Sequence, residues 1–374
     1  MQNIFDWLYD KSRNHDTKGI DLYSLIISKN NILLAYRNIK SNTGSSTMGT
    51  DSITIDKYKI DNQEEFIEEI RETLKDYKPQ AVRRVEIPKP NGKKRPLGIP
   101  TMRDRLIQQM FKQILEPVCE AQFHKHSYGF RANRSAKHAL ARCCFIMSRT
   151  GNHYVIDMDI KSFFDNVNHA RLMKQLWNIG IKDKRVLAII GKMLKAPVKG
   201  TGTPICGTPQ GGILSPLLSN VVLNDLDWWI SNQWETFPSR HRYTNSHKNR
   251  ALKTTSLKEM YIVRYADDAR IFAKTHKSAI RIYHAVRGYL ENQLKLEISP
   301  EKSKITNLRR KRSEFLGFEM KVVLKRKQYV TNTFVSRKSK EKIKQEIRQS
   351  VIRQIKRCRF RQIKTGLSEH LTMG

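Results

Sequence analysis

The sequence predicts an α+β fold in which helices cover a small β-sheet. Two apolar runs, Tyr261–Val263 and Ala269–Ala273, flank the acidic pair Asp267 and Asp268. This pattern is typical of a β-hairpin that carries both carboxylates at its turn. A second apolar strand ends in Asp159, and apolar residues at helical spacing fill several of the longer segments. The chain therefore combines strands that end in acidic residues with helices that pack on them.

The acidic residues at the two strand ends are candidate metal ligands. Adjacent carboxylates repel each other, and apolar neighbours make their desolvation costly, so a divalent cation commonly compensates them. Hard oxygen ligands of this kind suit Mg²⁺. An isolated Asp-Asp pair is more simply a solvated turn, but Asp159, Asp267 and Asp268 together can hold two Mg²⁺ for an in-line phosphoryl transfer. Asp157 shares a strand face with Asp159 and is a weaker candidate.

The net charge indicates the class of partner. The chain has 374 residues, with 70 Lys and Arg against 35 Asp and Glu, which gives a net charge of +35. Such an excess favours a polyanion over an anionic membrane surface, because the basic residues are spread through globular segments. No apolar run could span a bilayer, the N-terminus is not a signal peptide, and the five cysteines lack C-x-x-C spacing. These features predict a cytoplasmic protein with reduced thiols and no membrane partner.

The spacing of apolar residues predicts the elements in chain order. Helices are expected over residues 22–36, 66–77, 104–116, 135–147, 217–230, 278–294 and 343–355. Extended segments are expected over 83–100, over 154–159, on both sides of Asp267, and at Phe315. The first of these contains a turn at Asn91-Gly92. The stretch 231–258 is polar and has little periodicity, which predicts an exposed loop inserted between two elements. The last helix carries an apolar stripe on a basic background: Ile343, Ile347, Val351 and Ile355.

Eight short motifs run through the chain in order between about residues 30 and 335. They are NILLAYRNIKSNTGSSTMGTD, RRVEIPKPNGKKRPLGIPTMRDRLIQQ, HSYGFRANRSAKHAL, DMDIKSFFDNVNH, GTPQGGILSPLLSNVVLNDLD, YIVRYADD, ISPEKSKI and FLGFEM. Together they resemble the group II intron-encoded reverse transcriptases, or maturases. The resemblance implies a right-hand polymerase fold, with fingers, an α+β palm and a partial helical thumb. It also implies RNA-directed DNA synthesis with two Mg²⁺ held by Asp159, Ile160, Asp267 and Asp268.

The resemblance also divides the chain into regions. These are an N-terminal extension (1–60), fingers (61–150), a palm that includes the polar insertion (151–335), and an incomplete start of the thumb or maturase region (336–374). In the family, the N-terminal extension contacts the template and primer. A solvated loop beside a packing helix explains residues 1–60 equally well.

A basic hairpin in the fingers is the expected site for the incoming triphosphate. By resemblance, Lys89 and Arg95 are the residues that contact it. The alternative is a solvated basic turn. That alternative is weaker for Arg95, because Pro96 fixes the following backbone and because arginine suits bidentate phosphate contacts.

Three further residues are expected near the nucleotide by resemblance. Phe164 would lie under the sugar and exclude a 2′-hydroxyl by steric conflict, although either Phe163 or Phe164 could instead be a core residue. Gln210, in a Gly-rich loop, would lie beside the nucleotide and the templating base. Lys302 would act near the leaving pyrophosphate, and Lys304 could serve equally well.

The remaining expected contacts are with nucleic acid. Arg131 and Arg134 lie in a loop and are available for phosphate, while Gly317 would let the primer backbone approach closely.

The expected partners are an RNA template, a DNA primer, dNTPs and intron RNA, and the expected function includes help in splicing and mobility. Two other functions stay open: an RNA-binding maturase with little polymerase activity, and a reverse transcriptase serving phage defence or diversity generation. The intron-like N-terminal segment and the HSYGFR loop disfavour the last of these.

Overall fold

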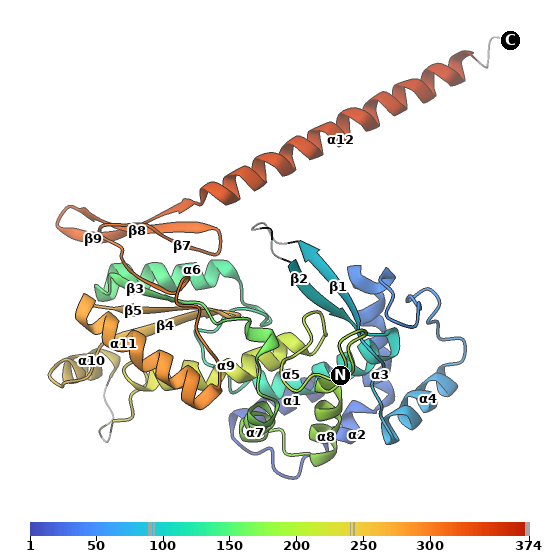
Figure 1. Cartoon of the computed structure of the whole chain (residues 1–374), viewed down its shortest axis with the longest axis horizontal. Coiled ribbons are helices and arrows are strands. Elements are labelled where there is room, and N and C mark those ends of the chain that lie inside the picture. The colour runs from blue at the N-terminus through green and yellow to red at the C-terminus, as the bar shows by residue number, and fades with distance from the viewer. Residues whose placement is uncertain (89–91, 93, 240, 242–243, 371–374) are drawn as a thin grey trace.

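The computed structural model describes residues 1–88, 92, 94–239, 241 and 244–370, without the side chains of 245–246 and 358–370. The elements follow one another in this order: α1 (Gln2–Arg13), α2 (Leu22–Ile26), α3 (Lys29–Lys40), α4 (Gln63–Lys75), β1 (Arg83–Pro88), β2 (Lys94–Ile99), α5 (Met102–Glu120), α6 (Ala136–Phe145), β3 (Tyr154–Met158), α7 (His169–Ile179), α8 (Lys184–Leu194), α9 (Ser215–Asn232), α10 (Asn245–Lys253), β4 (Met260–Tyr265), β5 (Asp268–Ala273), α11 (His276–Tyr289), β6 (Lys304–Asn307), β7 (Ser313–Phe315), β8 (Phe318–Lys325), β9 (Gln328–Val335) and α12 (Arg337–His370). Figure 1 shows their arrangement.

A four-stranded sheet carries the expected acidic residues. Its strands lie in the order β4-β5-β3-β6, and every neighbouring pair is antiparallel. β4 and β5 form the predicted hairpin, and their apolar residues are almost completely buried. α6 and α9 pack against β4, and α11 packs against β3 and β5 (Figure 1). The predicted α+β class and the acidic hairpin turn are therefore confirmed.

A group of helices centred on α5 forms the other half of the body. α1, α2 and α3 pack against α5, and one hydrophobic core runs continuously from Leu8 to Val322. The helix predicted over residues 22–36 is in fact two helices, α2 and α3, with a break at Ser28. The buried Asn31 side chain donates to the Ile26 carbonyl (2.8 Å) and to the Met110 carbonyl (3.1 Å). This amide satisfies the free end of α2 and fixes the break against α5.

The described residues of the polar stretch 231–258 are mostly exposed from residue 238 onward, as the composition predicts, but the stretch is not a simple loop. α9 continues into it, the Trp234 side chain is buried, and α10 follows. The Glu235 carboxylate lies 3.0 Å from His126 Nε2, 3.1 Å from the Arg142 guanidinium and 2.9 Å from Lys125 Nζ. These partners come from a region about a hundred residues earlier, so a local reading of the sequence could not find them.

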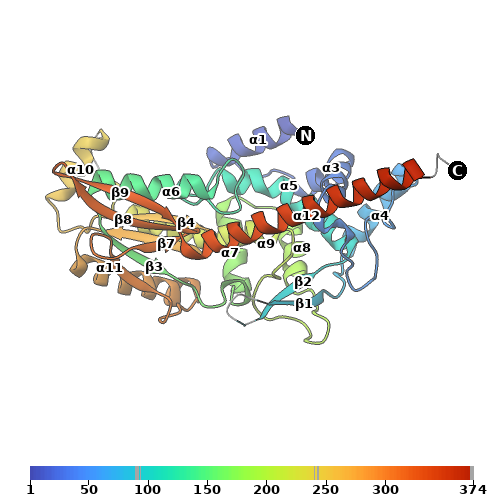
Figure 2. The ribbon, with the colours of Figure 1, turned by 90° about the horizontal axis from the view of Figure 1, so that it is seen from above.

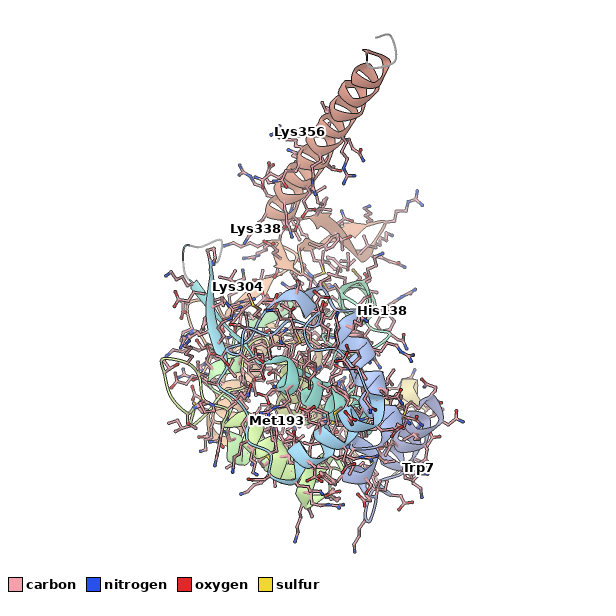
Figure 3. All side chains as sticks on the ribbon, turned by 90° about the vertical axis from the view of Figure 1, so that its right-hand side faces the viewer. Trp7, His138, Met193, Lys304, Lys338 and Lys356 are labelled. Atoms are coloured by element: carbon pink, nitrogen blue, oxygen red, sulfur yellow. The ribbon has the colours of Figure 1, made fainter. Side chains whose placement is uncertain are left out.

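The β7–β9 sheet and α12 lie beyond the central sheet. β7, β8 and β9 form a meander, and α12 projects from its end into solvent (Figures 1 and 2). Lys338 and Lys356 extend outward along this helix (Figure 3). The helix predicted around 343–355 is confirmed, but Ile343, Ile347 and Val351 are each about half exposed. No helix in the described ranges is both long and apolar enough to cross a membrane.

The Glu235 cluster gives a stability prediction. Glu235→Gln should lower the free energy of unfolding at pH 7 by about 3 kcal/mol, because Lys125 and Arg142 lose their counter-charge, and His126 loses a charged hydrogen-bond partner, in a mostly buried site. Burial opposes ionisation of this carboxyl, but His126 and the neighbouring cations outweigh it and hold its pKa below the usual 4.5. The stabilisation is therefore present above about pH 4.5 and is lost as the pH falls further.

Urea unfolding at several pH values measures this effect. The stabilities of the wild type and of Glu235→Gln should converge in acid. Glu69→Gln, at an exposed position on α4, is the matched control and should change stability by less than about 0.5 kcal/mol. A difference between wild type and Glu235→Gln that persists unchanged into acid would contradict the electrostatic explanation.

Candidate active site

The strand register brings two of the predicted carboxylates face to face. In the β3–β5 pair, Asp157 lies opposite Arg270 and Met158 lies opposite Ala269. The next step in this antiparallel register places Asp159 across from Asp268. The two side chains leave the same face of the sheet, at the end where β3 stops and β5 begins.

The surroundings of Asp268 disfavour its ionised form. Burial, then repulsion from Asp267 and Asp159, raises the pKa of Asp268 to about 6. Asp159 has a cationic partner in this structure, because Lys302 Nζ lies 3.0 Å from its Oδ2. Within the described part of the chain, no three Asp, Glu, His or Cys side chains converge into a ready-made metal site.

The donor set nevertheless fits a divalent cation. The three carboxylates supply hard oxygen ligands, and a cation would relieve the repulsion that raises the Asp268 pKa. Ile160 follows Asp159, and because its side chain is a hydrocarbon, only its backbone carbonyl can serve as a ligand. The three carboxylates and the Ile160 carbonyl suit Mg²⁺ by chemistry, although the carboxylates do not converge on one point in the described part of the chain.

A buried ion pair holds the turn between β4 and β5. Ala266 has a left-handed backbone (φ 57°), and its carbonyl accepts a 2.7 Å hydrogen bond from the Arg264 guanidinium. The same guanidinium pairs with Asp227 of α9 at 2.7 Å, and both side chains are almost inaccessible. Arg264 also donates to the Asn220 amide oxygen at 3.0 Å. α9 thus fixes the turn that precedes Asp267.

The SYGFR segment supports the same turn from another side. The Tyr128 N–H donates to the Arg264 carbonyl (2.9 Å), and the Arg264 N–H donates to the His126 carbonyl (3.0 Å). A Cβ on Gly129 would lie 2.2 Å from the Ala266 nitrogen, so only glycine fits against the turn. The sequence analysis missed Gly129, Arg264 and Asp227, because their roles depend on long-range packing.

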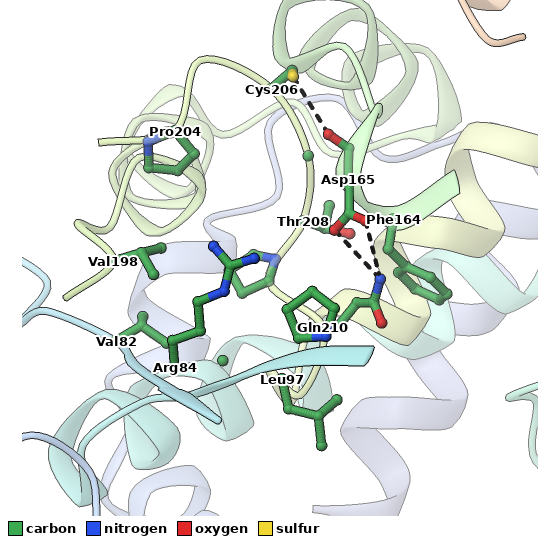
Figure 4. Close-up of a pocket in the computed structure, with 14 residues that line it drawn as sticks. Val82, Arg84, Leu97, Phe164, Asp165, Val198, Pro204, Cys206, Thr208 and Gln210 are labelled. Atoms are coloured by element: carbon green, nitrogen blue, oxygen red, sulfur yellow. Dashed lines mark hydrogen bonds between the residues drawn. The ribbon is translucent and has the colours of Figure 1, made fainter. Parts of the chain in front are cut away.

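A cavity of about 280 Å³ lies between the β1–β2 hairpin and the Gly-rich loop. Phe164 and Gln210 line it, and Gln210 Nε2 donates to the Asp165 carboxylate at 3.3 Å (Figure 4). Phe163 is buried in the core, so Phe164 is the ring that faces the cavity. The structure therefore brings together two of the three residues expected near the nucleotide.

An arginine that the sequence analysis did not select lines this cavity. Arg84 of β1 points into it (Figure 4). Arg95 is instead exposed on β2, opposite Ile87. Arg84 lies opposite Gly98 in the β1–β2 register, a pairing that the sequence alone does not reveal. Lys89, the other residue expected to bind triphosphate, lies outside the described residues.

The prediction that Arg131 contacts phosphate is corrected. Its side chain is 2% exposed and pairs with Glu120 at 2.6 Å. It also donates to the carbonyls of His124 (2.7 Å) and Ser127 (2.8 Å), so these donors are used inside the fold. The Arg134 side chain is 29% exposed; it donates to the Lys125 carbonyl at 2.7 Å and lies 3.9 Å from the Glu120 carboxylate.

Gly317 lies in the tight turn between β7 and β8. Both Leu316 (φ 50°) and Gly317 (φ 81°) have left-handed backbones, as a two-residue hairpin turn requires. A cavity of about 220 Å³ is lined by this turn together with Asp159, Asp268 and Lys302. The turn expected to hold the primer therefore faces the predicted metal ligands.

Comparison with known proteins decides the family. Residues 87–320 match the family described as reverse transcriptase (RNA-dependent DNA polymerase). The chain belongs to the reverse transcriptase family. The predicted family and reverse transcriptase fold are thus confirmed, and the chain carries an RNA-dependent DNA polymerase domain.

Relatives place this reverse transcriptase near group II intron proteins. Protein YkfC of Escherichia coli (strain K12) is 36% identical over 282 residues, which cover 71% of this chain and 73% of YkfC. The group II intron-encoded protein LtrA of Lactococcus lactis subsp. cremoris is 35% identical over 358 residues, which cover 84% of this chain and 58% of LtrA. Apo telomerase from Candida tropicalis aligns with a TM-score of 0.47 at 13% identity, over 65% of this chain and 46% of telomerase.

The packing of Gly129 gives a prediction for this reverse transcriptase. Gly129→Ala should displace the turn before Asp267 and lower primer extension at least about tenfold, because overpacking of this kind costs about 1–3 kcal/mol at the turn. Gly191→Ala is the matched control, since a Cβ at Gly191 on α8 meets nothing within 4 Å. Primer extension by the two purified variants measures the effect. Equal activities would contradict the supporting role of Gly129.

Proposed function

We propose that this reverse transcriptase extends a DNA primer on an RNA template and uses Asp159, Asp267 and Asp268 to hold two Mg²⁺. The observation that carries the proposal is the register that sets Asp159 across from Asp268, beside the turn at Gly317. When bound, the two ions would activate the primer 3′-hydroxyl and stabilise the pyrophosphate leaving group. Ile160 would contribute its backbone carbonyl.

The other residues would position the nucleotide. We assign the cavity of Phe164 and Gln210 to the nucleotide, with Phe164 as the ring that leaves no room for a 2′-hydroxyl. Lys89 and Arg95 would add positive charge where the transition state spreads negative charge over the phosphates. Lys302 would contact the leaving phosphate, since its ammonium already lies beside Asp159. No covalent nucleophile is required.

We also propose the regions and the RNA partner. Residues 61–150 would act as fingers, 151–335 as the palm, and 336–374 as the start of a thumb whose basic helix faces the duplex. LtrA is a group II intron-encoded protein, which supports intron RNA as a partner and help in splicing and mobility as a further role. The net charge of +35 supports binding to RNA in general.

Primer extension on a poly-purine RNA template with dNTPs and Mg²⁺ tests the polymerase proposal. Asp267→Asn should lower the rate at least about a hundredfold, because the ions contribute several kcal/mol to the transition state. RNA binding by the variant should stay within about twofold of the wild type, since the electrostatic contacts are elsewhere. Asp56→Asn, at an exposed position, is the matched control. A folded, RNA-binding wild type that does not extend the primer would contradict the proposal.

A further inference from the structure

Arg270 is a buried cation next to the predicted metal ligands. It follows Asp268 by two residues on β5, so both side chains leave the same face of the sheet. Its side chain is only 3% exposed. The residue across from it on β3 is Asp157, two residues before Asp159. Arg270 and Asp157 thus form the row directly behind the facing carboxylates.

The guanidinium of Arg270 connects two sheets. Its Nε lies 2.7 Å from Asp157 Oδ1 in the central sheet. Its Nη2 donates to Ser313 Oγ at 2.5 Å and to the Glu314 carbonyl, both in β7. Ser313 Oγ in turn donates to Asp157 Oδ2 at 2.9 Å, and the guanidinium lies 4.5 Å from the centre of the Phe315 ring. Every residue of β7 therefore touches this one side chain or its carboxylate partner.

β7 leads directly into the turn at Leu316 and Gly317. The Gly317 carbonyl accepts a 2.9 Å hydrogen bond from the Ser336 N–H, and a Cβ on Gly317 would lie 2.7 Å from Ser339 Oγ at the start of α12. The turn is consequently fixed on one side by α12 and on the other by Arg270. It lines the same cavity as Asp159 and Asp268.

We propose that Arg270 is a positioning residue that fixes the primer-holding turn at Gly317 relative to the carboxylates Asp159 and Asp268. This inference rests on the proposed polymerase function. Arg270 touches neither the nucleotide nor the metal ions. It acts by holding β7 to β5 through two hydrogen bonds, while its charge pair with Asp157 fixes the guanidinium against β3, so that the primer 3′ end meets the metal site at a fixed distance.

The chemistry of the link requires arginine. The planar guanidinium reaches the Asp157 carboxylate through Nε and the β7 acceptors through Nη2, whereas a lysine ammonium is a point charge on a flexible chain. Arg270→Lys therefore preserves the positive charge behind the carboxylates but loses the simultaneous contacts with both sheets. Ser313→Ala removes one acceptor of the same link and leaves the charge pair with Asp157 in place.

Single-turnover primer extension with a pre-bound primer–template tests the proposal. Arg270→Lys should lower the incorporation rate at saturating dNTP at least about tenfold, because a misplacement of about 1 Å can cost about a hundredfold in rate. The KM for dNTP and the Kd for primer–template should change by less than about twofold, since the hydrogen bonds of the Arg270 guanidinium go to Asp157 and β7 and would not be made to either ligand. Ser313→Ala should slow the same step, and the double variant should be no slower than the slower single variant, because both changes break one link.

Arg287→Lys is the matched control, since Arg287 lies on the surface of α11 in a pair with Glu291 at 2.8 Å; it should leave the rate unchanged. If Arg270→Lys does not fold, Ser313→Ala decides the test. If the folded variants incorporate nucleotide at the wild-type rate, this inference is overturned and the proposed function is not. The same holds if the variants lose primer binding and dNTP binding as much as they lose rate. An inactive wild type would overturn the proposed function and this inference with it.

Discussion

The arrangement of the site depends on one register, the pairing of β3 with β5. This pairing sets Asp159 across from Asp268 and leaves two like charges at the edge of an apolar sheet. The cost is visible in Asp268, whose pKa burial and its neighbouring carboxylates raise to about 6. A slip of one residue would turn every side chain of β3 to the other face and separate the pair. The fold therefore holds these groups together at an electrostatic cost, which a bound cation would relieve.

Two buried arginines fix the strands and the turn around these carboxylates. Arg264 pairs with Asp227 and holds the Ala266 carbonyl, while Arg270 pairs with Asp157 and reaches β7. Each guanidinium is nearly inaccessible, and each satisfies several acceptors that strands and turns leave free. Removal of one such partner leaves an uncompensated buried charge, so these pairs specify geometry more than they add stability.

The sequence was sufficient for features that depend on local pattern or on ordered motifs. The acidic hairpin, the strand that ends near Asp159, the helix around 343–355 and the family itself follow from apolar spacing and from the eight motifs. The sequence also directed attention to Phe164 and Gln210, which share a cavity.

Other features could not be predicted, because they depend on contacts between distant segments. Arg131 lies in a basic loop segment, which suggests an exposed phosphate contact. Its side chain is instead buried and bonded to Glu120 and to two backbone carbonyls. Glu235 lies in a polar stretch, yet Lys125, His126 and Arg142 fix it in place. Gly129 is one glycine among many until the Ala266 backbone is found against it. Charge and polarity in the sequence do not distinguish a solvated residue from one that is paired inside the fold.

Binding of Mn²⁺, followed by electron paramagnetic resonance, tests the central claim that the facing carboxylates form a divalent cation site. The wild type with bound primer–template and dNTP should take up two Mn²⁺ ions, in accord with a two-metal polymerase site. Asp159→Asn should lose most of this binding, although its distance from Asp267 along the chain exceeds a hundred residues. Equal Mn²⁺ binding by wild type and Asp159→Asn would contradict the claim that this register builds the metal site.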